Sequence, residues 1–263
     1  MVQSTVMPTP VHGSNASRLI PANMDQPKRL SLSTRNRLPE LMDQPGLDPV
    51  EHAAALWGLR RINSWSRSTA ILFPWIRRCA PEHGGRPLRV LDLACGGGDT
   101  VVALADRARR EGLPIQVDGC DISPQAVEHS RTQAETAGVN ARFFVHDALH
   151  GDLPPGYDVI MCSLFLHHFG EGDVQGILGR MKSAARRLVL ADDLVRSRFG
   201  YTLAWMGCRL LTRSKVVHYD GPVSVAGAFR VDEVASLAAK AGLDGAVVTR
   251  HWPERYLLSW ISV

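Results

Sequence analysis

From residue 85 onward, short apolar runs alternate with segments of helical spacing, and this alternation constrains the fold more than any other feature. The runs are rich in branched and aromatic residues and lie at 88–93, 115–120, 141–145, 157–162 and 188–191. Such alternation is typical of a parallel sheet wound with crossover helices. The sequence therefore predicts a doubly wound, three-layer α/β sheet of about seven strands.

The end of the chain supplies the remaining elements of this prediction. A helix is expected at 231–241, and strand-like runs follow at 246–249 and 256–261. We expect the last run to pair antiparallel at the sheet edge. Two earlier helices are expected at 100–110 and from Pro124 to Gly138, where a proline at the start and a glycine at the end match helix boundaries.

The residues before the alternation predict two further regions. Residues 1–37 are rich in proline, serine and arginine without apolar periodicity, so we expect a disordered basic tail. Residues 38–84 predict a helical cap, with one helix at about 48–63 and another at about 66–78. Trp65, between these two helices, is expected to help cover a bound ligand. The domain proper is expected at 85–263, with an apolar lid insertion at about 196–228.

Charge and cysteine usage exclude some classes of function. The formal net charge is +4, and residues 1–37 account for all of it, so the predicted domain is neutral and a nucleic-acid substrate is not expected. Five widely spaced cysteines with no Cys-x-x-Cys pair favour a reducing cytoplasm over a disulfide scaffold. No apolar run is long enough to span a membrane.

The first predicted strand ends in a glycine-rich turn, Asp92-Leu-Ala94-Cys-Gly96-Gly-Gly98, that leads directly into a helix. Successive glycines let backbone amides approach a ligand closely and permit angles that other residues avoid. The spacing breaks the Gly-x-Gly-x-x-Gly pattern of nicotinamide enzymes, and no Gly-Lys-Ser or Gly-Lys-Thr of a P-loop follows. The turn therefore predicts a ligand site of another kind.

Acidic residues follow the next two predicted strands. Asp121 closes the second strand, where a carboxylate can accept hydrogen bonds from both hydroxyls of a ribose, and Asp147 closes the third, where it could meet an adenine amine. The carboxyl ends of parallel strands form the ligand-binding edge of such sheets. Three suitable elements at three consecutive strand ends predict a nucleoside-containing ligand.

With these motifs, the run 88–195 resembles the class I S-adenosylmethionine-dependent methyltransferases, including quinone and small-molecule methyltransferases. Ala94 departs from the first glycine of the family's acid-x-Gly-x-Gly-x-Gly turn. The resemblance implies S-adenosyl-L-methionine as cofactor. The cofactor-binding residues that it implies are Asp92, Ala94, Gly96, Gly98, Asp121, Ile122, Asp147, Ala148 and Ser163.

Histidines after the fourth strand are the candidate catalytic residues. His167 and His168 lie where the family borders the acceptor cavity, and either could act as a base for a weakly acidic acceptor; His218 is a lesser candidate. Asp192 and Asp193 with one of these histidines could bind a divalent ion, as in some catechol methyltransferases. Carboxylates at strand ends are common, so no metal is predicted.

The sequence thus predicts a methyltransferase acting on a small phenolic or polyketide-like acceptor, with oxygen favoured as the methylated atom. Carbon methylation in quinone biosynthesis stays open as an alternative. A non-catalytic S-adenosylmethionine-binding protein and a nicotinamide oxidoreductase are the rivals from other classes. The acceptor's identity and the oligomeric state do not follow from the sequence.

Overall fold

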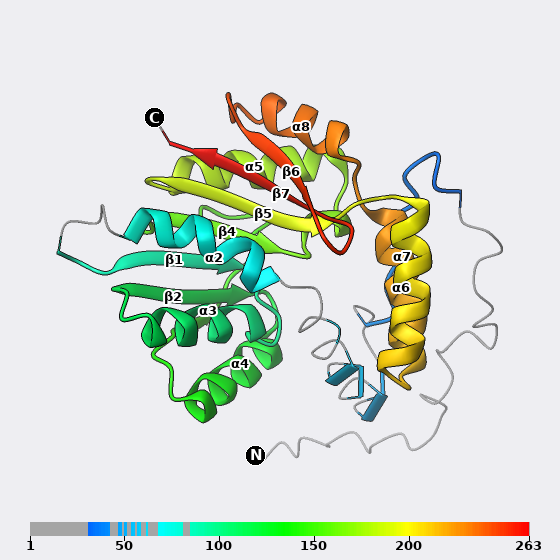
Figure 1. Ribbon diagram of the computed structural model, residues 1–263, viewed down its shortest axis with the longest axis horizontal. Coiled ribbons are helices and arrows are strands. Elements are labelled where there is room, and N and C mark those ends of the chain that lie inside the picture. Colours follow the sequence, from blue (N-terminus) through cyan, green and yellow to red (C-terminus); the bar gives the residue numbers. More distant parts are fainter. Residues whose placement is uncertain are drawn as a thin grey trace, which may run out of the picture.

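The computed structural model describes residues 31–42, 68–80 and 85–262, together with single or paired positions between 47 and 62. Its centre is one seven-stranded sheet with strand order β3-β2-β1-β4-β5-β7-β6 (Figure 1). The strands are β1 (Leu88–Leu93), β2 (Ile115–Asp121), β3 (Phe143–Val145), β4 (Val159–Ser163), β5 (Leu188–Leu194), β6 (Val247–His251) and β7 (Arg255–Ile261). The order reverses beside β1, so the carboxyl ends of β1 and β4 flank the switch point at which such sheets bind ligands.

The first five strands are parallel, and the last two depart from that direction. β7 pairs antiparallel with β5 on one side and with β6 on the other. The prediction that residues 256–261 lie antiparallel at the sheet edge is therefore right in direction and wrong in position, because β6 occupies the edge. β7 enters the sheet interior, and most of its residues are buried.

Helices cover both faces of the sheet, as the predicted three layers require. α2 (Ser68–Cys79), α3 (Asp99–Arg110) and α4 (Pro124–Ala137) share one apolar core with the sheet. α5 (Glu171–Ala184) and α8 (Val231–Lys240) pack with a second core on the opposite face (Figure 1). No helix in the described part of the chain is long and apolar enough to cross a membrane.

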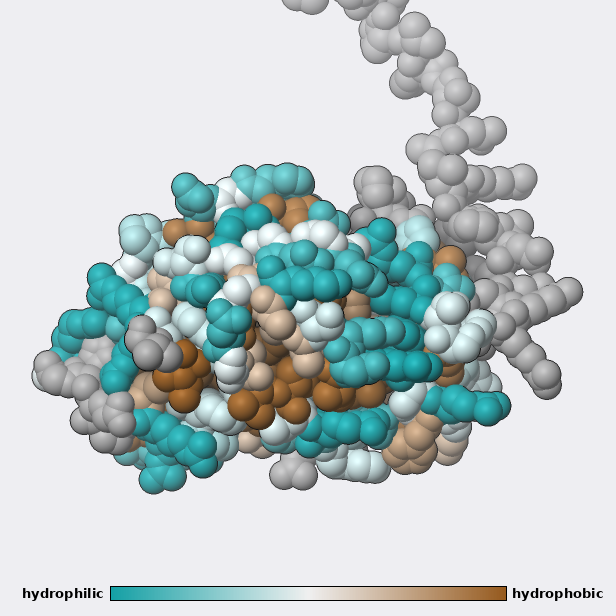
Figure 2. Space-filling view, turned by 90° about the horizontal axis from the view of Figure 1, so that it is seen from above, coloured by the Kyte–Doolittle hydropathy of each residue, from teal (hydrophilic) through white to brown (hydrophobic). Residues whose placement is uncertain are grey.

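The predicted lid insertion folds into two helices beside the sheet rather than on either face. α6 (Arg198–Leu211) and α7 (Lys215–Gly227) stand next to each other at one end of the molecule (Figure 1). α7 buries most of its residues, whereas α6 exposes Phe199, Met206 and Leu210. On the face seen from above, hydrophobic side chains form a central band and several smaller spots among mostly hydrophilic residues (Figure 2).

Local sequence signals explain where α4 begins and ends. The Ser123 side chain accepts a hydrogen bond from the backbone amide of Ala126, and Pro124 occupies the first turn. At the other end, Gly138 adopts a left-handed conformation with φ 62°, which ends the helix at little steric cost.

The N-terminal predictions are partly corrected. Residues 31–37, assigned to a disordered tail, are held against the domain, because the amide of Asn36 donates to the carbonyl of Ala226 at 3.0 Å. Asp48 accepts hydrogen bonds from the amides of Val50 and Glu51, as expected at a helix start, and the described positions from 50 to 62 are helical. Residues 1–30 and Trp65 lie outside the described residues.

A buried ion pair joins the inserted strand β7 to β5. Arg255 Nη2 donates to Asp192 Oδ2 at 2.6 Å, and both side chains are fully buried. Ser68 and Ser163 also accept hydrogen bonds from this guanidinium. A buried charge without its partner is costly, so the position of β7 depends on this pair.

Replacing Arg255 should therefore cost far more stability than replacing a surface arginine. We expect Arg255→Met to lower the free energy of unfolding by about 3–5 kcal/mol, because the Asp192 carboxylate loses its counter-ion. The double variant Asp192→Leu/Arg255→Met should recover most of that loss. Arg109→Met is the matched control, since Arg109 pairs with Asp106 on the surface, where such pairs contribute about 0–1 kcal/mol. Equal losses at Arg255 and Arg109 in urea unfolding would contradict this account.

Candidate functional site

The glycine-rich turn between β1 and α3 uses left-handed backbone conformations at alternate positions. Ala94, Gly96 and Gly98 have φ angles of 52°, 53° and 81°. A Cβ atom on Gly98 would lie 2.8 Å from Cβ of Ser130, so this position has no room for a side chain. A Cβ on Gly96 would meet nothing within 4 Å, so the turn leaves open space at Gly96 into which a ligand can fit.

Asp121, at the end of β2, is hydrogen-bonded to this turn and stabilises it. Its Oδ2 accepts a hydrogen bond from the amide of Gly96 at 2.9 Å, and its Oδ1 accepts one from the amide of Ser123 at 2.9 Å. A carboxylate oxygen accepts more than one hydrogen bond, so both oxygens keep capacity for a ligand. The neighbouring Ile122 is 65% exposed and presents an apolar surface beside this carboxylate.

Asp147 follows β3 and organises the next loop. Its carboxylate accepts hydrogen bonds from the amides of Leu149 and His150 and pairs with Nδ1 of His150 at 2.9 Å. The hydrogen bond from His150 is the main reason that the pKa of Asp147 lies below its usual value. Ala148 is buried, and its carbonyl accepts hydrogen bonds from Arg180.

Asp92, near the end of β1, has a buried carboxyl group. The residue is 2% exposed, and its Oδ1 has no hydrogen-bond partner among the described residues. Burial, followed by the charges of Asp121 and Asp192, raises its pKa well above the usual value. S-Adenosylmethionine carries an ammonium and a sulfonium, so the open turn and the excess of carboxylates here fit this cationic donor.

Ser163 ends β4 and contacts the buried ion pair of Asp192 and Arg255. Its hydroxyl oxygen lies 3.2 Å from Asp192 Oδ2 and 3.2 Å from the hydroxyl oxygen of Ser68, so its single proton can go to either. The next residue, Leu164, has a positive φ of 54°, and its amide donates to the carbonyl of Asp192 at 2.9 Å. Asp192 Oδ2 thus contacts Arg255 and Ser163, whereas Asp193 contacts His167; the metal role considered for Asp192 stays a hypothesis.

His167 lies in the short helix η2 (Leu166–His168) between two carboxylates. Its Nδ1 is 2.7 Å from Asp193 Oδ1, and its Nε2 is 3.4 Å from Glu40 Oε1. Burial alone would lower the pKa of His167, but Asp193 and Glu40 outweigh it and raise the pKa to about 10. At neutral pH the ring therefore holds both protons, which does not suit a general base.

His168 and His218 occupy different surroundings. The His168 ring is more open than that of His167 and stacks near it, with ring centroids 4.1 Å apart. His168 Nδ1 lies 4.0 Å from Glu40 Oε1. His218, in α7, pairs through Nε2 with the carbonyl of Thr212 at 2.8 Å, so this nitrogen fastens α7 to the end of α6.

Glu40 is the residue of this site that sequence reasoning missed. It reaches the histidines because the segment 31–42 is fixed along α7 and η2. Arg35 and Arg37 donate to the carbonyls of His167 and His168, and Asp220 accepts from the amides of Leu41 and Met42. The only local signal was Pro39-Glu40 at the start of the predicted cap, which does not reveal a distant partner.

Most residues of this site lie within a region that matches a known protein family. A family described as "Methyltransferase domain" matches residues 90–187, which include the glycine-rich turn, Asp121, Asp147 and the two histidines of η2. Demethylmenaquinone methyltransferase from Deinococcus radiodurans is 31% identical over 122 residues, covering 45% of this chain and 48% of the relative. Ubiquinone biosynthesis O-methyltransferase from Leptothrix cholodnii is 31% identical over 97 residues, covering 36% and 38% respectively.

Solved structures extend the likeness to most of the described fold. The plantazolicin methyltransferase, crystallised with a substrate analogue and S-adenosylhomocysteine, aligns with a TM-score of 0.61 at 14% identity, covering 81% of this chain and 91% of that one. The fold of the present chain is thus the class I methyltransferase fold. Residues 90–187 are thus similar to a methyltransferase domain. The chain spans about half the length of the first curated relatives that it matches.

The alanine at the first position of the turn should cost stability. Left-handed backbone is unfavourable by about 1–2 kcal/mol for residues with a Cβ, so we expect Ala94→Gly to raise the free energy of unfolding by about 1 kcal/mol. The matched control is Ala137→Gly in the last turn of α4, which should lower it by up to about 1 kcal/mol. Urea unfolding of both variants checks the opposite signs; a loss of stability in both would contradict the strain.

Proposed function

We propose that this chain transfers the methyl group of S-adenosylmethionine to a hydroxyl oxygen of a small aromatic acceptor, such as a phenol or a polyketide-like ring. In this reaction the sulfur–methyl bond breaks, an oxygen–methyl bond forms and the hydroxyl releases its proton. The observation that carries the proposal is the group formed by Glu40, His167 and His168 beside the end of β4, next to the donor-side carboxylates.

The donor is proposed to lie along the ends of β1, β2, β3 and β4. The turn that contains Ala94, Gly96 and Gly98 would face the methionine part, with Asp92 supplying negative charge. Asp121 would accept from the ribose hydroxyls, because both of its oxygens keep acceptor capacity. Ile122, Asp147 and Ala148 would border the adenine, and Ser163 would lie near the sulfonium. The open space at Gly96 supports this arrangement.

The acceptor is proposed to lie against η2. His168 is the more open of the two neighbouring histidines and would meet the hydroxyl, whereas His167 would position it from between Asp193 and Glu40. Phe165 and Phe169 flank the pair, with their rings 4.8 Å apart, and favour an aromatic ring nearby. His218 is the weaker candidate because its Nε2 is occupied by Thr212.

Carbon methylation of a quinone ring is the second candidate. The similarity to demethylmenaquinone methyltransferase favours it, just as the similarity to the ubiquinone O-methyltransferase favours oxygen. Both reactions use the same donor geometry and both release a proton. A small molecule is proposed over nucleic acid because the chain beyond residue 37 has no net charge.

Asp121 offers a test of the donor site by itself. We expect Asp121→Ala to weaken binding of S-adenosylhomocysteine by about 1–3 kcal/mol, because a charged acceptor is lost. Isothermal titration calorimetry measures the affinity. Asp244→Ala is the matched control, since Asp244 is exposed in the turn before β6, at the opposite edge of the sheet. An unchanged affinity in a folded Asp121→Ala protein would contradict the ribose contact.

Product analysis with an isotopically labelled donor tests the reaction. The purified chain is incubated with S-adenosylmethionine carrying a deuterated methyl group and a panel of phenols, hydroxylated polyketides and reduced quinones. We expect labelled methyl ethers from the phenolic acceptors, identified by mass spectrometry and NMR. Label on ring carbon would favour the quinone reaction instead. Binding of S-adenosylhomocysteine with no labelled product across the panel would favour a non-catalytic binding protein.

A further inference from the structure

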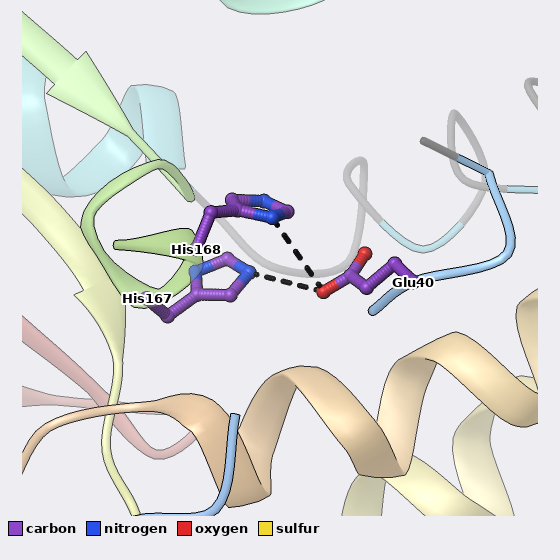
Figure 3. A group of neighbouring side chains, drawn as sticks. All are labelled: Glu40, His167 and His168. Atoms are coloured by element: carbon purple, nitrogen blue, oxygen red, sulfur yellow. Dashed lines mark ion pairs between the residues drawn. The ribbon is translucent and has the colours of Figure 1, made fainter. Parts of the chain in front are cut away.

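Three potential metal ligands from distant parts of the chain meet at the acceptor side of the site. Glu40 extends from the segment 31–42, and His167 and His168 extend from η2, so that the two rings and the carboxylate face one another (Figure 3). One ligand atom from each residue can be chosen so that all three lie within 4.8 Å of one another. We propose that Glu40, His167 and His168 bind one divalent transition-metal ion, such as Zn²⁺.

The distances suit a shared ion after small side-chain movements. Two ligand atoms that are each about 2.0–2.1 Å from a tetrahedral ion lie about 3.3 Å from each other. Glu40 Oε1 is 3.4 Å from His167 Nε2 and 4.0 Å from His168 Nδ1. A shared ion would require the more exposed His168 ring to move closer to the other two ligand atoms.

The groups around the three ligands hold them in the orientation that an ion needs. Asp193 Oδ1 lies 2.7 Å from Nδ1 of His167, which directs the other ring nitrogen toward Glu40, and a bound ion would replace the proton on that nitrogen. A carboxylate behind a ligating histidine is a recurrent feature of metal sites because it fixes the ring and strengthens the ligand. The hydroxyl of Ser224 donates to Glu40 Oε1 at 2.6 Å and fixes the carboxylate in the same way.

The backbone that carries the two histidines is fixed as well. Arg35 Nη2 donates to the carbonyl of His167 at 2.8 Å, and Arg37 Nη1 donates to that of His168 at 3.1 Å. The amide of His167 donates to Asp193 Oδ2 at 3.0 Å. The ligands are therefore largely in place before an ion arrives, which limits the conformational entropy lost on binding.

The ligand types select the kind of ion. Two imidazoles with one carboxylate suit zinc and its first-row neighbours, whereas Mg²⁺ and Ca²⁺ prefer sites made of oxygen atoms. Three protein ligands leave a tetrahedral ion one open position, as in catalytic zinc sites. If the proposed function holds, the acceptor hydroxyl would occupy this open position. The ion would make the hydroxyl easier to deprotonate, and the proton would pass to solvent before the oxygen attacks the methyl group.

Metal binding can be measured without donor or acceptor. The untagged full-length chain is treated with a chelator, freed of it, and titrated with Co²⁺, whose visible absorption reports coordination by imidazole nitrogen. We expect one Co²⁺ per chain, displaced by one equivalent of Zn²⁺. Glu40→Gln and His168→Ala should each weaken Co²⁺ binding at least tenfold, and Asp193→Asn about 10–100-fold. Circular dichroism of the metal-free variants checks that each remains folded.

Two matched controls separate the site from surface binding. Glu171→Gln and His150→Ala alter exposed residues of the same types and should bind Co²⁺ as the unaltered chain does. The proposal is overturned if the chain binds no stoichiometric Co²⁺, or if Glu40→Gln binds it with unchanged affinity. If methyl transfer continues in the presence of a chelator, that result would contradict the metal site but support the proposed function. Tight Co²⁺ binding without methyl transfer to any acceptor would instead support the metal site and contradict the function.

Discussion

Carboxylates gathered at the ends of neighbouring strands set the electrostatic constraint on which the rest of the site depends. They are Asp92, Asp121, Asp192 and Asp193. Repulsion between like charges strengthens as water is excluded, so each carboxylate needs its own compensation. Asp121 accepts hydrogen bonds from backbone amides, Asp192 pairs with Arg255, and Asp193 pairs with His167. Asp92 keeps an oxygen without a partner in the described part of the chain, which suits a cationic ligand.

The elements that the sequence predicts well are those encoded by neighbouring residues. The apolar run of β1, the glycines after it and the Ser123-Pro124 start of α4 act over a few positions, and all three appear in the structure. α5 was not predicted, because three glycines within Glu171–Ala184 dilute its helical pattern. Strand order was also beyond local reasoning, since the pairing of β7 with β5 depends on contacts between distant segments.

The candidate site also contains residues that the sequence predicts and residues that it does not reveal. The predicted donor-side residues follow consecutive strand ends, so the parallel fold alone brings them together. Arg255 and Glu40 were missed because a single arginine or glutamate in a sequence carries no sign of its burial or of a partner more than a hundred residues away. Two of the non-glycine residues with left-handed backbone, Ala94 and Leu164, directly follow β1 and β4, and strained conformations tend to collect at functional sites.

The docked segment 31–42 has a consequence for how relatives of this chain should be compared. The matched family region, residues 90–187, contains the donor-side carboxylates of β1 and β2 but neither Glu40 nor Arg255. Two proteins can therefore share the whole matched region and still differ at the positions of Glu40 and Arg255. A change in the flanking segments could therefore alter the surroundings of His167 and His168, which lie inside the matched region, while the glycine-rich turn stays the same.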